Sequence, residues 1–326
     1  VFDATLRAGT KTAADGGSGS IVATTMVLDA STIETVSSGA GRAGDLAVSA
    51  GAVVLTGSSL GSRVSGAGDA GRVTVSADTV IGDGAALYSA SFGLGNGRLL
   101  SLTAGSAAFE NSWLITASQP GSSGKSGAID IHAGTLLADA TIVSASTFGA
   151  GQGGSVAIDA DHVQLINDSQ ILSDTDTAAG SEAGTVSVTA GELLMDGSRL
   201  SSTTFGDFDA GSVTVRAGSI HMSNGALIQS DSGLFSRGNA GNLDIRTGSL
   251  VLEDSLISNT TFGSGNAGAL TLNVAGDATL SNSSIAANSF DAGDAGSIAI
   301  SAGSLSVTDN TVISSGPVLD STGRGG

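Results

Sequence analysis

The sequence predicts an all-β fold in which one domain coils as a right-handed parallel β-helix, a solenoid of about eleven turns of roughly 28 residues with three short strands each. Three observations predict this. A glycine-containing phrase recurs at intervals of 26 to 30 residues, apolar residues follow each copy at alternate positions, and Gly, Asn, Asp and Ser separate the apolar runs. The right hand is expected because parallel crossover connections strongly favour it.

The recurring phrase sets the period. The clearest copies end in Ala-Gly and the looser copies in another glycine dipeptide, and their anchoring glycines are Gly44, Gly71, Gly97, Gly127, Gly154, Gly184, Gly211, Gly241, Gly268 and Gly296. Apolar residues occupy the second and fourth positions after most anchors, as in Val73 and Val75. Such alternation, rich in β-branched residues, is typical of a half-buried strand and not of a helix.

Two further apolar segments complete each unit. A pair nine and eleven residues after the anchor, such as Leu250 and Leu252, and a position near the sixteenth, such as Ile257, predict the second and third strands. In the Gly97 and Gly268 units the later positions move along by one residue. We expect the extra residue to lie in a turn, because an insertion inside a strand would turn the inward side chains outward.

The repeat divides the chain into three segments. Residues 17–316 form the predicted β-helix, residues 1–16 an N-terminal extension and residues 317–326 a flexible tail. The ends of a β-helix expose unpaired strand edges that can accept another chain. Val1, Phe2 and Leu6 therefore mark a candidate assembly strand that pairs with the last turn of the next copy. The alternative is that the native protein continues beyond both ends.

The composition excludes several classes of partner. Lys and Arg number 12 against 30 Asp and Glu, which gives a formal charge of −18, and there is no Cys. Nucleic acids and anionic membranes require a basic face, so neither is expected as a partner. No apolar run approaches the roughly 20 residues of a membrane-spanning helix, and no signal peptide is recognised. The lack of Cys is compatible with export, because a β-helix needs no disulfides.

A column of polar residues just before the anchors is the first candidate site. Its members are Arg42, Asp69, Asn96, Lys125, Gln152, Glu182, Asp209, Asn239, Asn266 and Asp294. Side chains stacked at turn spacing can hydrogen-bond along the column, so we interpret them as a structural turn ladder. The alternative is a calcium ion between Glu182 and Asp209, whose carboxylates fall on neighbouring turns. No other cofactor is expected.

Aromatic residues form a second periodic set. Phe92, Phe148, Phe205 and Phe262 recur on every second turn, each directly before a glycine. The pattern predicts a satellite cluster in which the rings anchor a long loop, with Phe235 and Phe290 filling intervening turns. The alternative is an apolar stripe exposed for binding a neighbour.

Outward positions of the first strand bear on catalysis. His132 should lie beside Asp159, and Arg216 beside Asp244, as exposed pairs on neighbouring turns. A polysaccharide-cleaving β-helix would need two carboxylates that face one groove. No motif of that kind stands out, so no catalytic residue is assigned and an enzyme is not expected.

Two segments carry a family resemblance. Residues 260–272 (TTFGSGNAGALTL) and 238–245 (GNAGNLDI) resemble the repeats of filamentous-haemagglutinin-like exoproteins. The resemblance covers nearly all of residues 17–316. It implies the β-helical shaft of a large bacterial surface protein, exported by two-partner secretion through an outer-membrane transporter. Residues 1–326 show no counterpart of that family's secretion domain or of a toxin-like carboxy-terminal domain.

The resemblance implies roles in adhesion, biofilm cohesion and contact with other cells. We therefore expect a secreted structural and adhesive rod at a bacterial surface. Its expected partners are further copies stacked end to end, or glycans and proteins of a host or cell surface. The alternative is a polysaccharide-binding or polysaccharide-cleaving β-helix protein.

Overall fold

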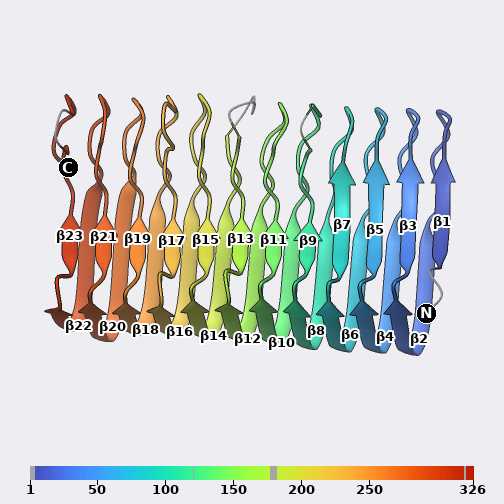
Figure 1. Cartoon of the computed structure of the whole chain (residues 1–326), viewed down its shortest axis with the longest axis horizontal. Coiled ribbons are helices and arrows are strands. Elements are labelled where there is room, and N and C mark those ends of the chain that lie inside the picture. The colour runs from blue at the N-terminus through green and yellow to red at the C-terminus, as the bar shows by residue number, and fades with distance from the viewer. Residues whose placement is uncertain (1–3, 120, 177–181, 319–320) are drawn as a thin grey trace.

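The computed structural model describes residues 4–119, 121–176, 182–318 and 321–326. These residues form 23 strands and no helix, and the strands lie in two parallel sheets. The strands stand side by side in a row, with the two ends of the chain at opposite ends of that row (Figure 1). The predicted all-β parallel solenoid is confirmed. The described part of the chain has no helix of the length and apolarity that a bilayer crossing requires.

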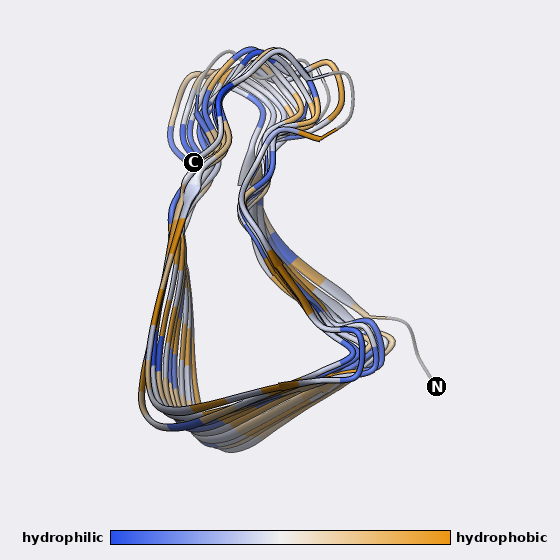
Figure 2. Cartoon of the chain, turned by 90° about the vertical axis from the view of Figure 1, so that its left-hand side faces the viewer, coloured by the Kyte–Doolittle hydropathy of each residue, from blue (hydrophilic) through white to orange (hydrophobic). Residues whose placement is uncertain are grey.

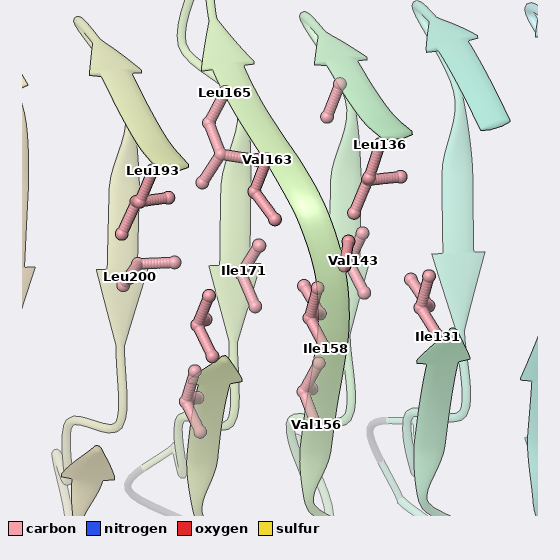
Figure 3. Packing of buried hydrophobic residues seen from close by; sticks show 14 of the residues in the cluster. Ile131, Leu136, Val143, Val156, Ile158, Val163, Leu165, Ile171, Leu193 and Leu200 are labelled. Carbon is pink, nitrogen blue, oxygen red and sulfur yellow. The ribbon is translucent and has the colours of Figure 1, made fainter. Parts of the chain in front are cut away.

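Each turn contributes one long strand to an 11-stranded sheet. These strands are β2 (Gly19–Asp29), β4 (Leu46–Thr56), β6 (Val73–Asp83), β8 (Leu100–Glu110), β10 (Ile129–Asp139), β12 (Val156–Ile166), β14 (Val186–Asp196), β16 (Val213–Ser223), β18 (Leu243–Glu253), β20 (Ala269–Ser281) and β22 (Ser297–Thr308). The first two predicted strands of a unit are the two halves of this element. In β12, Val156 and Ile158 lie in the first half, and Val163 and Leu165 in the second (Figure 3).

A short strand follows each long one and corresponds to the third predicted strand. The members of this 12-stranded sheet are β1 (Thr5–Thr10), β3 (Thr32–Ser37), β5 (Ser59–Val64), β7 (Ala86–Ser91), β9 (Trp113–Ile115), β11 (Ile142–Ser144), β13 (Gln170–Leu172), β15 (Arg199–Ser201), β17 (Leu227–Gln229), β19 (Leu256–Ser258), β21 (Ser284–Ala286) and β23 (Val312–Ser314). A row of single bridges, from Ser91 to Pro317, continues the pairing beyond it. Seen along the stack, the turns superimpose as a three-sided outline with a rounded crest (Figure 2).

Aliphatic rows fill the interior. One row runs through the short strands by way of Leu60, Leu114, Leu200 and Ile285, all of which are 0% exposed. Burial of such a side chain contributes about 1.5–3 kcal/mol. Because every turn adds members to the same rows, cohesion is spread along the whole stack and not concentrated in one place.

A left-handed residue forms the corner between the long and short strands. The corner residue has φ of 45° at Ala30, 59° at Gly84 and 46° at Ala140. Where two consecutive residues are left-handed, as at Asn167 and Asp168, the corner holds one residue more. Insertions of this kind stay outside the strands, so the inward rows keep their phase.

The anchoring glycines are required by the close approach of neighbouring turns. A Cβ on Gly211 would lie 1.6 Å from the carbonyl oxygen of Gly184, and a Cβ on Gly184 would lie 1.7 Å from that of Gly154. Neither glycine has a left-handed φ. Their role is to let backbone stack on backbone, which differs from the turn-forming role that the composition suggests.

One anchor differs from the prediction. The N–H of Arg98 donates to Ser89 Oγ (2.9 Å), as the N–H of Gly71 donates to Ser62 Oγ (2.7 Å). Arg98, and not Gly97, therefore occupies the anchor position. The predicted insertion in the Gly97 unit is wrong, and Asn96 takes the regular place two residues before the anchor.

The extra residue of the Gly268 unit lies inside a strand and not in a turn. The pairing of β20 with β22 shifts between Val274 and Asp277. This is a β-bulge at the middle of the long strand, and Leu280 beyond it is still 0% exposed. The prediction of a turn insertion is wrong here, although the inward rows keep their phase.

Both ends of the chain take part in the solenoid. Leu6 pairs with Ile33 in the β1–β3 ladder, so residues 5–10 of the predicted extension belong to the sheet. Val1 and Phe2 lie outside the described residues. At the other end, Pro317 bridges to Ser289, and the described part of the predicted flexible tail follows the register of the preceding turn.

Candidate functional site

The polar column before the anchors is a ladder of hydrogen bonds. Oδ1 of Asp69 accepts bonds from the backbone N–H (3.0 Å) and the side-chain amide (2.9 Å) of Asn96. Oδ1 of Asn96 then accepts a bond from the N–H of Lys125 (2.9 Å). In the same way, Oδ1 of Asp15 accepts a bond from the N–H of Arg42 (2.8 Å). A second run of such bonds passes through Asp209, Asn239, Asn266, Asp294 and Arg324. Each side chain thus satisfies the backbone of the following turn.

The charge state of Asp69 fits this structural role. Burial alone would raise the pKa of its carboxyl, but the hydrogen bonds from Asn96 and the nearby Arg98 guanidinium outweigh burial and lower the pKa. The Arg98 Nη1 to Asp69 Oδ2 distance is 3.4 Å. The carboxylate is therefore held in its charged, accepting form.

Gln152 and Glu182 take part in the column through their backbone carbonyl groups and not through their side chains. These accept bonds from the N–H groups of Ser126 (2.9 Å) and Gly153 (3.3 Å). Glu182 and Asp209 do lie on neighbouring turns, since the N–H of the next residue, Ala183, donates to the carbonyl of Asp209 (3.1 Å). Calcium takes six to eight oxygen ligands. Within the described ranges no three His, Asp or Glu side chains are grouped to hold a metal ion.

The periodic aromatic residues form a half-exposed column on the outer wall, which we call the phenylalanine column: Phe92, Phe148, Phe205, Phe262 and Phe290. The exposed fractions of these rings run from 36% to 50%. The rings of Phe262 and Phe290 stack with their centroids 4.9 Å apart. A hollow of about 370 Å³ separates Phe148 from Phe205. Phe235 does not fill an intervening turn as expected, because it is 95% exposed outside the column.

The predicted outward pairs of the long strands are confirmed. His132 Nδ1 lies 3.8 Å from Asp159 Oδ2, and Arg216 Nη2 lies 3.7 Å from Asp244 Oδ2. Each of these side chains except Asp244 is about half exposed or more. Exposed pairs of this kind contribute about 0–1 kcal/mol. Their chemistry is that of a solvated strand surface.

A cluster of charged and polar side chains on the short strands β1, β3, β5 and β7 joins the turns more strongly than these exposed pairs do. Glu34 on β3 is 4% exposed, and its carboxylate receives three partners. Arg7 Nε lies 2.7 Å from Oε1, Arg63 Nε lies 3.1 Å from Oε2, and the Tyr88 hydroxyl donates to Oε2 at 3.0 Å. Burial, followed by the charge and hydrogen bond of Glu34, raises the pKa of Tyr88 well above its ordinary value. Four successive turns are thereby tied to one buried carboxylate.

A groove of about 610 Å³ opens beside this carboxylate, and we call it the basic groove. Its charged lining residues are Arg7, Lys11 and Arg63, and Phe92 lines it as well. Both guanidinium groups are about half exposed. Three cations against the single carboxylate of Glu34 leave a local formal excess of two positive charges, in a chain of net charge −18.

A smaller hollow of about 210 Å³ lies next to the basic groove, and we call it the aromatic hollow. It shares Arg63 and Phe92 with the groove and adds Tyr88 and Trp113. Trp113 and Tyr88 are the only residues of their kinds in the chain. Trp113 and Phe92 are 45% and 50% exposed, so each ring has a face open to a ligand.

The sequence prediction missed the residues of the basic groove and the aromatic hollow, apart from Phe92. A signal was present, because Arg7, Glu34, Gly61 and Tyr88 follow one another at intervals of 27 residues and form one column of the short-strand sheet. This column begins at Arg7, which precedes the first recognisable anchor, Gly44. The repeat phrase therefore does not assign Arg7 to a turn.

A second buried cluster lies under the outer wall near the middle of the rod. Asp174 accepts bonds from Arg199 Nη2 (2.6 Å), Ser201 Oγ (2.7 Å) and the N–H of Thr203 (2.7 Å). Burial raises the pKa of Asp174, and the Arg199 charge opposes that effect. The group is a compact structural ion pair.

Asp231 lies two turns further along, and its carboxylate forms no ion pair with the described residues. Its Oδ1 accepts bonds from Ser258 Oγ (2.8 Å) and from the N–H of Thr260 (2.7 Å). The side chain is only 7% exposed, and this burial raises the pKa of Asp231 to about 6 against those hydrogen bonds. Asp231 is thus a buried carboxyl that changes charge near neutral pH.

The fold defines the chain as a parallel β-solenoid protein. No protein-family model, no curated protein and no solved structure matches it. The function therefore has to be inferred from the chain's own residues.

Proposed function

We propose that this chain is an extracellular structural and adhesive rod of a bacterial surface. The observation that supports this most is the single continuous core, which joins every described turn from β2 to β22 in one stack. An object held together along its whole length is stiff, and it presents its outer side chains in long columns. A stiff rod with repeated columns of surface side chains is suited to present binding surfaces at a distance from the cell.

Self-association of this 326-residue chain is part of the proposal. Inward positions that are fully buried in earlier turns are open at the last turn, where Leu305 and Val307 are 47% and 46% exposed. Strand edges with an apolar interior favour the addition of a further turn. We propose that copies stack end to end through these faces, with β1 of one copy against β23 of the next and β2 against β22.

Export by two-partner secretion rests on the resemblance of residues 238–245 and 260–272 to filamentous-haemagglutinin-like repeats. The absence of Cys from the chain suits a polypeptide that crosses an outer-membrane transporter unfolded. Adhesion and biofilm cohesion are proposed on the same resemblance. The proposal includes no catalytic activity.

Negative-stain electron microscopy over a range of concentrations tests the structural part. The expected result is short rods that join end to end as concentration rises. Leu305→Asp should keep the rods separate, because it places a charge in the proposed contact. The matched control is Ile81→Asp, since Ile81 is 46% exposed on β6, away from both ends of the stack. Separate rods at every concentration, or equal loss of stacking in both variants, contradict the proposal.

Binding of polysaccharide is the second candidate function. The specific observation in its favour is the basic groove with the adjoining aromatic hollow. Grooves of several hundred Å³ with a few placed polar groups are the usual form of a ligand site. This candidate is compatible with the adhesive role of the rod.

A further inference from the structure

We infer that the basic groove and the aromatic hollow together bind an extended oligosaccharide that carries carboxylate groups, such as an oligouronate. This inference deepens the adhesive part of the proposed function and rests on it. The ligand class follows from three features of the site: its charge, its preorganised guanidinium groups and its open aromatic faces.

The charge of the site selects an anion. Three of the chain's 12 basic residues line this one groove, while the net charge of the chain is −18. An anionic ligand is repelled by most of the surface and attracted only where positive charge is in local excess. The site therefore captures an anion at a defined place on the rod.

The guanidinium groups are held ready for that anion. The buried carboxylate of Glu34 holds Arg7 through Nε and Nη2, and it pairs with Arg63 through Nε. Arg63 lines the groove, and Glu34 is its one ion-pair partner among the residues that the structure describes. Arginine binds planar carboxylates through paired N–H groups, and a fixed guanidinium loses little further freedom when it does so. These groups favour a carboxylate on the ligand.

The aromatic faces point to a sugar as the carrier of the carboxylate. Phe92 and Trp113 both line the hollow and are about half exposed, and Arg63 is shared between hollow and groove. An exposed ring face can pack against the flat apolar face of a pyranose, while the hydroxyl groups of the sugar stay in water. The site thus combines aromatic rings, which can pack against sugar rings, with cations, which can bind the carboxylate groups of those sugars.

The length of the site points to an oligomer. The residues run from Arg7 on β1 to Trp113 on β9, which is a span of four turns. At about 4.8 Å a turn this is on the order of 20 Å. A single sugar would contact only one part of such a site, whereas an extended chain contacts both the cations and the rings.

Trp113 makes the test direct, because it is the only tryptophan of the chain and its fluorescence reports on this site alone. The probe is a galacturonate oligomer, titrated at physiological ionic strength. We expect a saturable change in fluorescence and no change with a neutral maltose oligomer of equal length. The heat of binding, measured by calorimetry, should give the same Kd.

Two variants address the two halves of the site. Phe92→Ser is compatible with the fold, because Ser65 and Ser38 hold the same column position in the preceding turns. Arg63→Ala matches its register neighbour Ala90 and leaves Glu34 with Arg7 and Tyr88. Each should weaken binding about tenfold or more. The matched controls, Phe205→Ser and Arg216→Ala, should bind as the unaltered chain does.

Four outcomes overturn the inference: no saturable signal, equal weakening in the controls, binding of polyglutamate as tightly as of the uronate, or equal binding of a sulfated dextran. The last two would indicate an acidic-peptide site or simple ion exchange. End-to-end stacking in the microscope does not depend on the sugar. Failure here is therefore distinguishable from failure of the rod proposal.

Discussion

The hydroxyl group of Tyr88 lies 3.0 Å from Oε2 of Glu34, although the two residues are separated by an entire intervening turn. The ring reaches across because Gly61 holds the position between them. A Cβ at Gly61 would lie 2.3 Å from Cε2 of Tyr88. A glycine on one turn, a carboxylate on the turn before and a phenol on the turn after thus form a single brace.

Gly61→Ala should break this brace. The methyl group displaces the Tyr88 ring, and Glu34 loses one hydrogen bond in a buried place, which costs about 1–3 kcal/mol of unfolding free energy. Guanidinium chloride unfolding measures the loss. Gly17→Ala is the matched control, because a Cβ there meets nothing within 4 Å. Equal effects of the two substitutions would show that the brace does not contribute.

Ionisation of Tyr88 offers a second test, because it is the only tyrosine. Burial and the Glu34 charge raise its pKa, so ultraviolet absorbance should show phenolate only well above pH 10 in the folded chain. The unfolded chain in concentrated guanidinium should titrate near the ordinary value. A pKa raised by folding means that this residue's stabilisation is lost as the pH rises above about 10. Identical titration curves for the folded and unfolded chains contradict the described contact.

Asp231→Asn should remove a pH dependence of stability. The pKa of Asp231 is raised to about 6, so between about pH 4 and 6 the folded chain holds a proton that the unfolded chain has released. Asp231 therefore makes the folded state lose stability as the pH rises through this range. The variant should gain on the order of 2–3 kcal/mol near pH 7 and little near pH 4.

Unfolding midpoints across this pH range give the comparison. Asp78→Asn is the matched control, because it removes an exposed carboxylate from a long strand. A gain for Asp231→Asn that is just as large at acidic pH would disprove the role of ionisation.

Asn259→Ser should raise stability. Asn259 is 0% exposed, and neither polar atom of its side chain has a hydrogen-bond partner in the described chain. The equivalent residues Ser202 and Ser230 donate to the carbonyl groups of Gly184 (2.7 Å) and Gly211 (2.5 Å). A hydroxyl at this position would reach the carbonyl of Gly241 and remove a buried unsatisfied amide, a gain of about 1–2 kcal/mol.

The neighbouring Asn288 supplies the control for that change. Its amide donates to Ser314 Oγ (2.8 Å), and its Oδ1 accepts from the N–H of Gly316 (3.2 Å). Asn288→Ser should therefore lower the thermal midpoint, whereas Asn259→Ser raises it. A fall in both variants is the result that would refute the assignment.

The stack of turns could be predicted from the sequence because its cause is periodic. Inward aliphatic residues such as Val73 and Val75 recur in every unit, and the same contact is made in each. The bulge of β20 could not be located, since the pattern shows that a residue has been added but not which backbone segment absorbs it. Gly97 is the predicted anchor because glycine stands next to Arg98, whereas the hydrogen bond to Ser89 and the pairing of Val73 with Leu100 place Arg98 at that position.

The basic groove could not be predicted from the repeat pattern for a different reason. Arg7, Arg63, Tyr88 and Trp113 differ in type from the residues paired with them on neighbouring turns, so their only mark in the sequence is the 27-residue spacing of Arg7, Glu34, Gly61 and Tyr88. They form a site only because Glu34 draws three of them together. Interactions that depend on unique residues require the three-dimensional register.

Labelling of intact cells tests the central claim most directly. An antibody against this chain, applied to living, unpermeabilised cells of the organism that produces it, should bind their surface or extracellular material and be seen there by immunogold electron microscopy. Labelling that appears only after the cells are permeabilised would contradict the account of an extracellular rod.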